Sequence, residues 1–107
     1  MPQREIHGVT MTDKYILKDR VPVPCENLLD WARWFETADR HVAKSVNDKV
    51  RVSTVFLGLD HQWGKGPPML FETMIFGGEH DQYQERCSTF EEAKMMHKKA
   101  CELAGVE

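Results

Sequence analysis

The 107-residue chain lacks the features that mark disulfide-rich proteins and membrane proteins. It has only three cysteines, Cys25, Cys87 and Cys101, which lie far apart and include no Cys-x-x-Cys pair. This pattern argues against a disulfide framework or a zinc knuckle, and the simplest expectation is buried thiols. No apolar run has membrane-spanning length, and residues 1–14 contain no apolar core like that of a secretory signal. The sequence therefore predicts a cytoplasmic protein without a membrane anchor.

The chain also lacks an excess of basic residues and the common cofactor motifs. It has 17 acidic and 14 basic residues, for a net charge of −3, so no basic stripe indicates binding to nucleic acid. Gly64-Lys65-Gly66 does not have the residue spacing of a Walker-type phosphate loop, and no His-Glu-x-x-His zinc motif is present. We therefore expect no nucleic acid, no cofactor and no metal.

The length of the chain predicts one folded domain. It has room for a single modest core, which we place in residues 14–107, and we expect residues 1–13 to be disordered or loosely ordered. Two short extended runs within residues 15–23 include Pro22, and Pro24 follows them. Because proline has no amide donor, a strand in this region should lie at the edge of a sheet.

An amphipathic helix is predicted next, and either Glu26 or Asn27 can begin it. The apolar residues that share one face at helical spacing are Leu28, Trp31, Ala32, Phe35 and Val42. The end of this helix is open, because residues 41–46 can either extend it or form a strand that turns at Asn47-Asp48. We favour the strand.

The second half of the chain predicts further strands. Residues 50–59 and 69–76 are rich in β-branched and large apolar side chains, which is typical of strands in the interior of a sheet. We expect these two strands to be antiparallel neighbours. Residues 83–87 alternate between polar and less polar side chains, which indicates a half-exposed strand.

A closing helix has sequence signals at both of its ends. Ser88 and Thr89, each followed three residues later by a glutamate, predict a capping box, and Gly105 predicts the C-terminal end. Met95 and Met96 are interpreted as packing residues of this helix. Its apolar face comprises Phe90, Ala93, His97, Ala100, Cys101 and Ala104. The order of elements predicts an α+β domain in which two helices pack on one face of an antiparallel sheet of about four to five strands.

The loop between the two central strands holds the candidate chemistry. Asp60 and His61 could act as an acid and base pair or bind a metal, with Glu72 on the following strand. The competing interpretation is structural, because an aspartate at the end of a strand often accepts backbone amides in a turn. A metal would need more ligands, and the spacing to Glu72, His80 and Asp81 matches no known metal motif.

Side-chain alternation in the two central strands predicts a contact surface. We sort the residues by parity, which assigns the odd positions, among them Val55 and Phe71, to an apolar face against the helices. The even positions form the opposite face, which is too apolar to lie in water and should therefore be covered by a partner. Glu72 on that face should find a cation or a donor, or else have a raised pKa. The predicted contact residues are Phe56, Leu70, Met74 and Phe76.

Three further residues each have two interpretations. Trp63 in the loop and Trp34 on the outer side of the first helix are either anchors of a protein interface or are partly buried without a partner. His97 is either the partner of a nucleophilic cysteine, Cys87 or Cys101, or a hydrogen-bonded core residue, and we favour the core.

Several segments of the chain carry a resemblance to a known family. They are Trp31-Ala32-Arg33-Trp34-Phe35-Glu36, Ser53-Thr54-Val55-Phe56-Leu57-Gly58-Leu59-Asp60-His61, Gly66-Pro67-Pro68, Leu70-Phe71-Glu72-Thr73-Met74, Ser88-Thr89 and Glu91-Glu92-Ala93. Together they resemble a family of small uncharacterised proteins of tailed bacteriophages and prophages, from about Tyr15 to the last helix. The family often has an aromatic residue where Cys87 stands. The resemblance implies a phage or prophage origin and an accessory role in the host cell, but no activity.

Two functions from different classes follow from these observations. The preferred one is a non-enzymatic protein-interaction module, a homodimer in the host cytoplasm that modulates a host factor. The alternative is a small hydrolase-type or metal-dependent enzyme that uses Asp60, His61 and Glu72.

Overall fold

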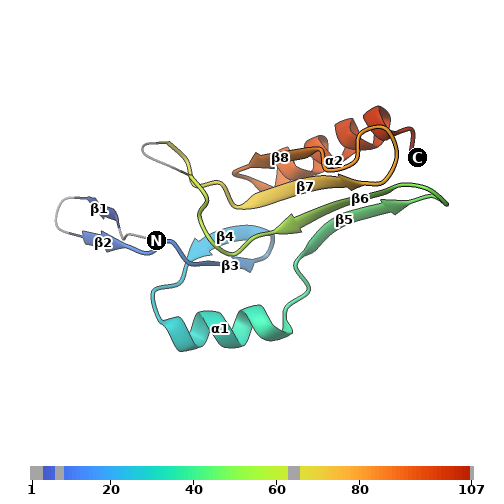
Figure 1. Cartoon of the computed structure of the whole chain (residues 1–107). Coiled ribbons are helices and arrows are strands. Elements are labelled where there is room, and N and C mark those ends of the chain that lie inside the picture. Colours follow the sequence, from blue (N-terminus) through green and yellow to red (C-terminus); the bar gives the residue numbers. More distant parts are fainter. Residues whose placement is uncertain (1–3, 7–8, 63–65, 107) are drawn as a thin grey trace.

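A four-stranded antiparallel sheet is the largest element of the computed structural model, which describes residues 4–6, 9–62 and 66–106 (Figure 1). Its strands follow one another in chain order, and they are β5 (His41–Val46), β6 (Arg51–Phe56), β7 (Phe71–Phe76) and β8 (Gln84–Cys87). The two apolar runs form β6 and β7, which pair antiparallel as predicted. The predicted strand over residues 41–46 is confirmed as well, because the first helix ends before it.

Two hairpins precede the sheet. Strands β1 (Arg4–Ile6) and β2 (Val9–Met11) pair with each other, and so do β3 (Tyr15–Lys18) and β4 (Val21–Pro24). Strand β4 carries both prolines and pairs with β3 alone within the described chain, as expected of a strand at a sheet edge. The β3–β4 turn places Asp19 and Arg20 at φ 51° and 70°, the left-handed conformation that a tight hairpin turn requires.

The N-terminal segment meets the rest of the domain at its last residues. Thr12 and Asp13 are buried, and the Asp60 amide donates to the Asp13 carbonyl oxygen at 2.8 Å. These two residues therefore belong to the packed domain. The prediction of a loosely ordered segment over residues 1–13 falls partly on residues 1–3 and 7–8, which lie outside the described residues.

Two helices complete an α+β fold, which confirms the predicted fold class. Helix α1 (Leu28–Thr37) begins at Asn27, whose side-chain oxygen accepts the Asp30 amide at 3.0 Å. Helix α2 (Phe90–Ala104) begins with the predicted capping box of Thr89 and Glu92. It ends at Gly105, which has a φ of 74° and so adopts the left-handed conformation that glycine tolerates best.

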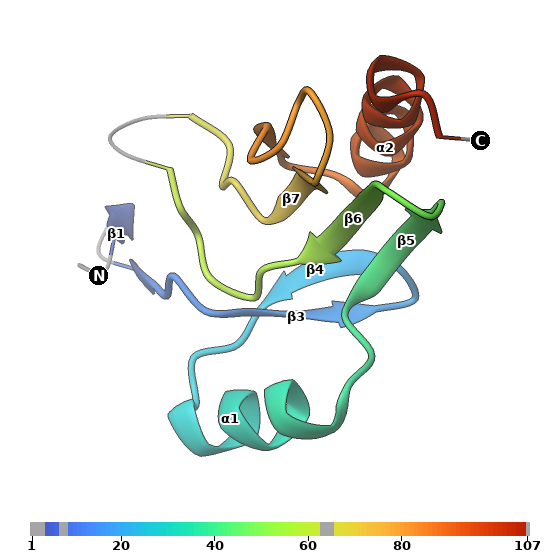
Figure 2. The ribbon, with the colours of Figure 1, turned by 45° about the vertical axis from the view of Figure 1, so that its right-hand side comes forward.

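Helix α2 covers one face of the sheet, hereafter the inner face. Val52 and Ile75 pack there against the second half of the helix, and Phe56 and Phe71 pack against Ala93 in its first turn. Figure 2 shows the helix running along this side of β6 and β7. In both views α1 lies on the opposite side of the β3–β4 hairpin from α2.

Helix α1 is attached to the end of β6 through Gly58. The Trp31 indole Nε1 donates to the Gly58 carbonyl oxygen at 3.0 Å, and the Phe35 ring lies over the glycine. A side chain at Gly58 would meet Phe35 at 3.0 Å, and the φ of 78° would strain any other residue. The glycine therefore permits close approach of the helix.

The predicted assignment of residues to the two sheet faces is confirmed for β7 and wrong for β6. The register pairs Val52 with Ile75, Thr54 with Thr73 and Phe56 with Phe71, so even positions of β6 share a face with odd positions of β7. The sorting by parity assumed that even positions on both strands face the same side. The opposite, outer face carries Arg51, Ser53, Val55, Glu72, Met74 and Phe76.

The structure also bears on the membrane prediction. Among the described residues, no helix combines the length and the apolar character needed to cross a membrane.

Candidate functional site

Asp60 organises the loop that follows β6. It is almost fully buried, and its carboxylate accepts the Gln62 amide at 2.8 Å and the Met69 amide at 3.0 Å. The two amides belong to the two ends of the loop, so the carboxylate holds these ends together. The His61 amide adds a bond to the Met69 carbonyl oxygen at 3.1 Å. These contacts match the structural interpretation of Asp60, a turn in which the side chain accepts backbone amides.

Glu72 lies on the outer face and is held by β8. Its carboxylate accepts the Arg86 Nε at 3.0 Å and also the Gln84 side-chain amide. The predicted cation and donor for Glu72 are therefore present. Asp60 and Glu72 are thus bound by different partners, loop amides in one case and β8 side chains in the other. Within the described residues, no group of three or more histidine, cysteine, aspartate and glutamate side chains is placed to hold a metal ion.

The predicted contact residues divide between the core and the outer face. Phe56 and Leu70 are 0% and 1% exposed, so their assignment to a contact surface is wrong. They lie in the core because the antiparallel register turns Phe56 toward α2, and Leu70 packs in the same cluster. Met74 and Phe76 do lie on the outer face and are half-buried, with the Arg51 guanidinium 4.4 Å from the centre of the Phe76 ring.

The predictions for Trp34 and Trp63 stand differently. Trp34 is half-buried and packs edge-on against Phe56, with ring centroids 5.6 Å apart. This position corresponds to the partial-burial interpretation. Trp63 lies outside the described residues, and its two interpretations stay predictions.

His97 is a hydrogen-bonded core residue, as favoured from the sequence. It is 7% exposed, its Nδ1 lies 2.7 Å from Thr54 Oγ1, and its Nε2 lies 2.9 Å from Ser45 Oγ. Thr54 is bonded in turn to Thr73, so a chain of polar groups crosses the sheet beneath α2. Burial lowers the pKa of His97, which keeps the ring neutral. Both ring nitrogens are hydrogen-bonded to hydroxyl groups, so neither is paired with a cysteine thiol.

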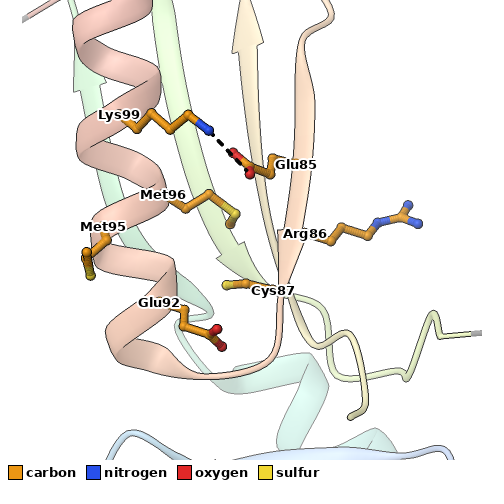
Figure 3. A pocket seen from close by; sticks show the side chains of 7 residues that line it. All are labelled: Glu85, Arg86, Cys87, Glu92, Met95, Met96 and Lys99. Carbon is orange, nitrogen blue, oxygen red and sulfur yellow. Dashed lines mark ion pairs between the residues drawn. The ribbon is translucent and has the colours of Figure 1, made fainter. Parts of the chain in front are cut away.

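A groove lies between α2 and the edge strand β8 (Figure 3). It has a volume of about 560 Å³ and is lined by Glu85, Arg86, Cys87, Glu92, Met95, Met96 and Lys99. The figure shows Cys87 and Met96 directed toward each other across the groove, whereas Arg86 points to the other side of β8. At one end the Lys99 ammonium and the Glu85 carboxylate form an ion pair of 3.7 Å between helix and strand.

Cys87 contributes an uncharged side chain to this groove. Burial and, to a smaller extent, the nearby Glu92 carboxylate raise the pKa of its thiol to about 11. The thiolate, not the thiol, is the nucleophile and the metal ligand. Because the Cys87 thiol stays protonated near neutral pH, it lines the groove as an apolar group that donates weakly to the Thr89 carbonyl oxygen at 3.6 Å.

The outer edge of β8 borders the groove. Within the described chain β8 pairs with β7 alone. The Ile75 amide donates to the Tyr83 carbonyl oxygen at 3.0 Å, which shows that the backbone groups of the odd-numbered residues face β7. Backbone groups alternate between the two edges of an antiparallel strand. The amides and carbonyls of Gln84 and Arg86 are therefore directed away from β7. The site combines a row of backbone donors and acceptors with an apolar groove.

The sequence interpretation missed this site. Met96 packs in the core as expected, but Met95 is 74% exposed, so its interpretation as a packing residue is wrong. A signal was present, because Met95 stands between Lys94 and the lysines at 98 and 99 on the polar side of the helix. A large apolar residue in that position marks a place where something else can pack.

Comparisons with protein-family models, with curated proteins and with solved structures found no match for this chain.

Proposed function

We propose that this protein is a non-enzymatic interaction module that binds an extended segment of another protein along the outer edge of β8. The observation that carries the proposal is the juxtaposition of that edge with the groove formed by Cys87, Met95 and Met96. In β-strand addition, backbone hydrogen bonds to a sheet edge supply affinity, and pockets for alternate side chains supply specificity. The edge of β8 offers the backbone groups for such pairing, and the groove offers the pocket.

The geometry defines how such a segment would lie. Its backbone would pair with the outward amides and carbonyls of Gln84 and Arg86. Side chains alternate along a strand, so every second side chain of the segment would point to the inner-face side and enter the groove. There Met96, which is 6% exposed, forms part of the floor, and the exposed Met95 offers a flexible, polarisable contact that adapts to apolar side chains of different shape.

A second copy of the chain fits this edge poorly. Two copies joined through β8 would be related by a twofold axis perpendicular to the sheet, so each face would stay on the same side. In a register centred on β8, either Glu85 lies opposite Glu85 of the second copy, or Arg86 lies opposite Arg86 of the second copy. Like charges directly opposite each other destabilise strand pairing. The edge therefore favours a different protein, and the homodimer expected from the sequence stays a prediction.

The resemblance to small phage and prophage proteins suggests a setting for this partner, namely a protein of the host cell. The hydrolase-type alternative has less support. Asp60 is engaged with loop amides, Glu72 with Arg86, and Cys87 is a protonated thiol. Each of these groups has a structural role that accounts for its position.

The experiment that tests the proposal uses two substitutions of Arg86. Random eight-residue peptides displayed on a surface are selected on the full chain, and selected peptides are titrated against Arg86→Ala and Arg86→Pro. Both variants lose the ion pair with Glu72, but only proline removes the outward amide of β8. Glu85 is extended, which is the conformation that a following proline requires, and prolines are tolerated at sheet edges.

We expect Arg86→Ala to bind the selected peptides as the wild-type chain does and Arg86→Pro to bind about tenfold more weakly, since it lacks a backbone hydrogen bond and places a ring at the edge. Equal binding by the two variants would refute strand addition on β8. Circular dichroism on both variants confirms that the sheet is retained.

A further inference from the structure

We infer that the bound segment carries a basic residue two positions from an apolar anchor, and that Glu92 is the residue that recognises its charge. This inference rests on the proposed binding of a segment along β8. It names the chemistry of the partner, which strand addition by itself leaves open.

The charges around the groove are unequal. Two carboxylates, Glu85 and Glu92, line it, whereas Lys99 is the cation directed into it. Arg86 is turned to the outer face, where its Nε is bound to Glu72 at 3.0 Å. Lys99 is engaged with Glu85, so the negative charge that a ligand meets is that of Glu92.

Glu92 is positioned to bind a cation without giving up its role in the helix. Its Oε1 accepts the Thr89 amide and hydroxyl, each at 3.1 Å, and lies 3.4 Å from the Ser88 amide. All three of these contacts are made by Oε1, which leaves Oε2 for a ligand. The carboxylate is therefore fixed in place by its capping contacts and still presents an oxygen to the groove.

The positions of anchor and cation follow from the spacing of a strand. The apolar part of the groove, made by Cys87 and Met96, lies between the Glu85–Lys99 ion pair at one end and Glu92 at the other (Figure 3). Adjacent side chains on one face of a strand belong to residues two apart. A segment whose apolar side chain rests on Met96 therefore directs the residue two positions along the chain toward Glu92. Lysine or arginine at that position would meet the carboxylate.

The chain offers a matched pair of substitutions for the test. Glu92→Gln removes the charge but keeps the capping box, because glutamine at this position caps as glutamate does. Glu91→Gln makes the same charge change in the same helical turn, on a residue that pairs with Lys94 and does not line the groove. The probes are peptides selected from the random eight-residue library and synthetic versions in which each lysine or arginine is replaced by glutamine.

We expect the selected peptides to contain lysine or arginine two positions from methionine, leucine or phenylalanine. Glu92→Gln should weaken binding about fivefold, as expected of an exposed ion pair, and Glu91→Gln should leave it unchanged. The effect should shrink in 1 M salt and disappear with the glutamine versions of the peptides. Matching thermal unfolding curves for the two variants show that the helix cap is intact.

Three results distinguish the ways in which this inference and the proposed function can fail. The selected peptides could bind the wild-type chain but not Arg86→Pro, show no preference for lysine or arginine, and bind Glu92→Gln as tightly as wild type. That result overturns the inference and leaves strand addition standing. A selection without any peptide sensitive to Arg86→Pro overturns both. A wild-type chain that sediments as a dimer, with Arg86→Pro as a monomer, assigns the edge to a second copy and also overturns the inference.

Discussion

The outer face of the sheet and the groove beside β8 both expose apolar side chains, but they differ in how those side chains are packed. On the outer face Phe76 lies beneath the Arg51 guanidinium, and Glu72 is paired with Arg86, so the surface is covered by its own residues. At the groove Met95 is 74% exposed, and among the described residues no strand pairs with the adjacent edge of β8. Apolar content alone therefore does not mark a binding site. Apolar side chains beside unused backbone hydrogen-bonding groups are the better indication.

The largest expected effect tests the assignment of the two sheet faces. Phe56→Ala should lower the free energy of unfolding by about 3–5 kcal/mol, because the ring is fully buried and its removal leaves a cavity. Phe76→Ala on the outer face should cost less than half as much, since its ring is half-buried under Arg51. Urea unfolding of both variants measures the difference. Equal losses would contradict the observed register.

The polar chain beneath α2 should give the next largest effect. Thr54→Val removes the hydroxyl that bonds His97 Nδ1 and leaves a buried ring nitrogen without that partner, at a cost of about 1–3 kcal/mol. Ser45→Ala, which removes the half-buried hydroxyl at Nε2, should cost less because water can replace it. Chemical unfolding of the two variants provides the test, and a larger loss for Ser45→Ala would count against the assigned burial.

The same histidine predicts how stability depends on pH. Burial lowers the pKa of His97 in the folded state below the ordinary histidine value of 6.5, so the unfolded chain takes up a proton first as the pH falls. The contribution of His97 to stability is therefore complete above about pH 6.5 and is lost as the pH falls from there toward the lowered folded-state pKa. Urea midpoints between pH 8 and pH 5 should fall less for His97→Gln than for the wild-type chain. If the urea midpoints of the two proteins fall equally with pH, His97 is not the origin of the pH dependence.

An effect of similar size separates the structural from the catalytic interpretation of the loop. Asp60→Ala should lower the free energy of unfolding by about 1–3 kcal/mol, because the Gln62 and Met69 amides lose their acceptor. His61→Ala should change it by about 0.5 kcal/mol or less, as a substitution away from the core does. Differential scanning calorimetry on the two variants compares them. Two variants of equal stability would mean that the carboxylate does not hold the loop.

The smallest change in stability belongs to the groove. Met95→Ser should leave the free energy of unfolding within about 0.5 kcal/mol of the wild-type value, because the side chain is mostly exposed. It should nevertheless weaken peptide binding by removing part of the apolar wall. Thermal unfolding and peptide titration on the same sample test both statements, and a marked loss of stability would mean that Met95 is a packing residue after all.

Local sequence signals predicted the elements of this fold well. The capping box at Thr89 and the terminal Gly105 fixed the ends of α2, and β-branched runs located β6 and β7. These features depend on neighbouring residues only. The partner and cation of Glu72 and the core position of His97 were also predictable, because a buried polar group must find a partner.

The assignment of faces and the groove could not be predicted in the same way. Alternation along one strand does not determine which parity of the next strand shares its face, since that depends on the register across the long loop between Phe56 and Phe71. The groove arises where α2 passes β8, so its lining comes from two elements that are adjacent only after folding.

The direct test of strand addition to β8 is amide hydrogen exchange at Gln84 and Arg86, followed by nuclear magnetic resonance during titration with a selected peptide. In the free protein these amides point outward from the edge of β8 and should exchange faster than those of Glu85 and Cys87, which face β7. On binding, both outward amides should become protected, while the amides of the outer face residues should stay unchanged. Unchanged exchange at Gln84 and Arg86 in the presence of saturating peptide would contradict binding by strand addition to β8.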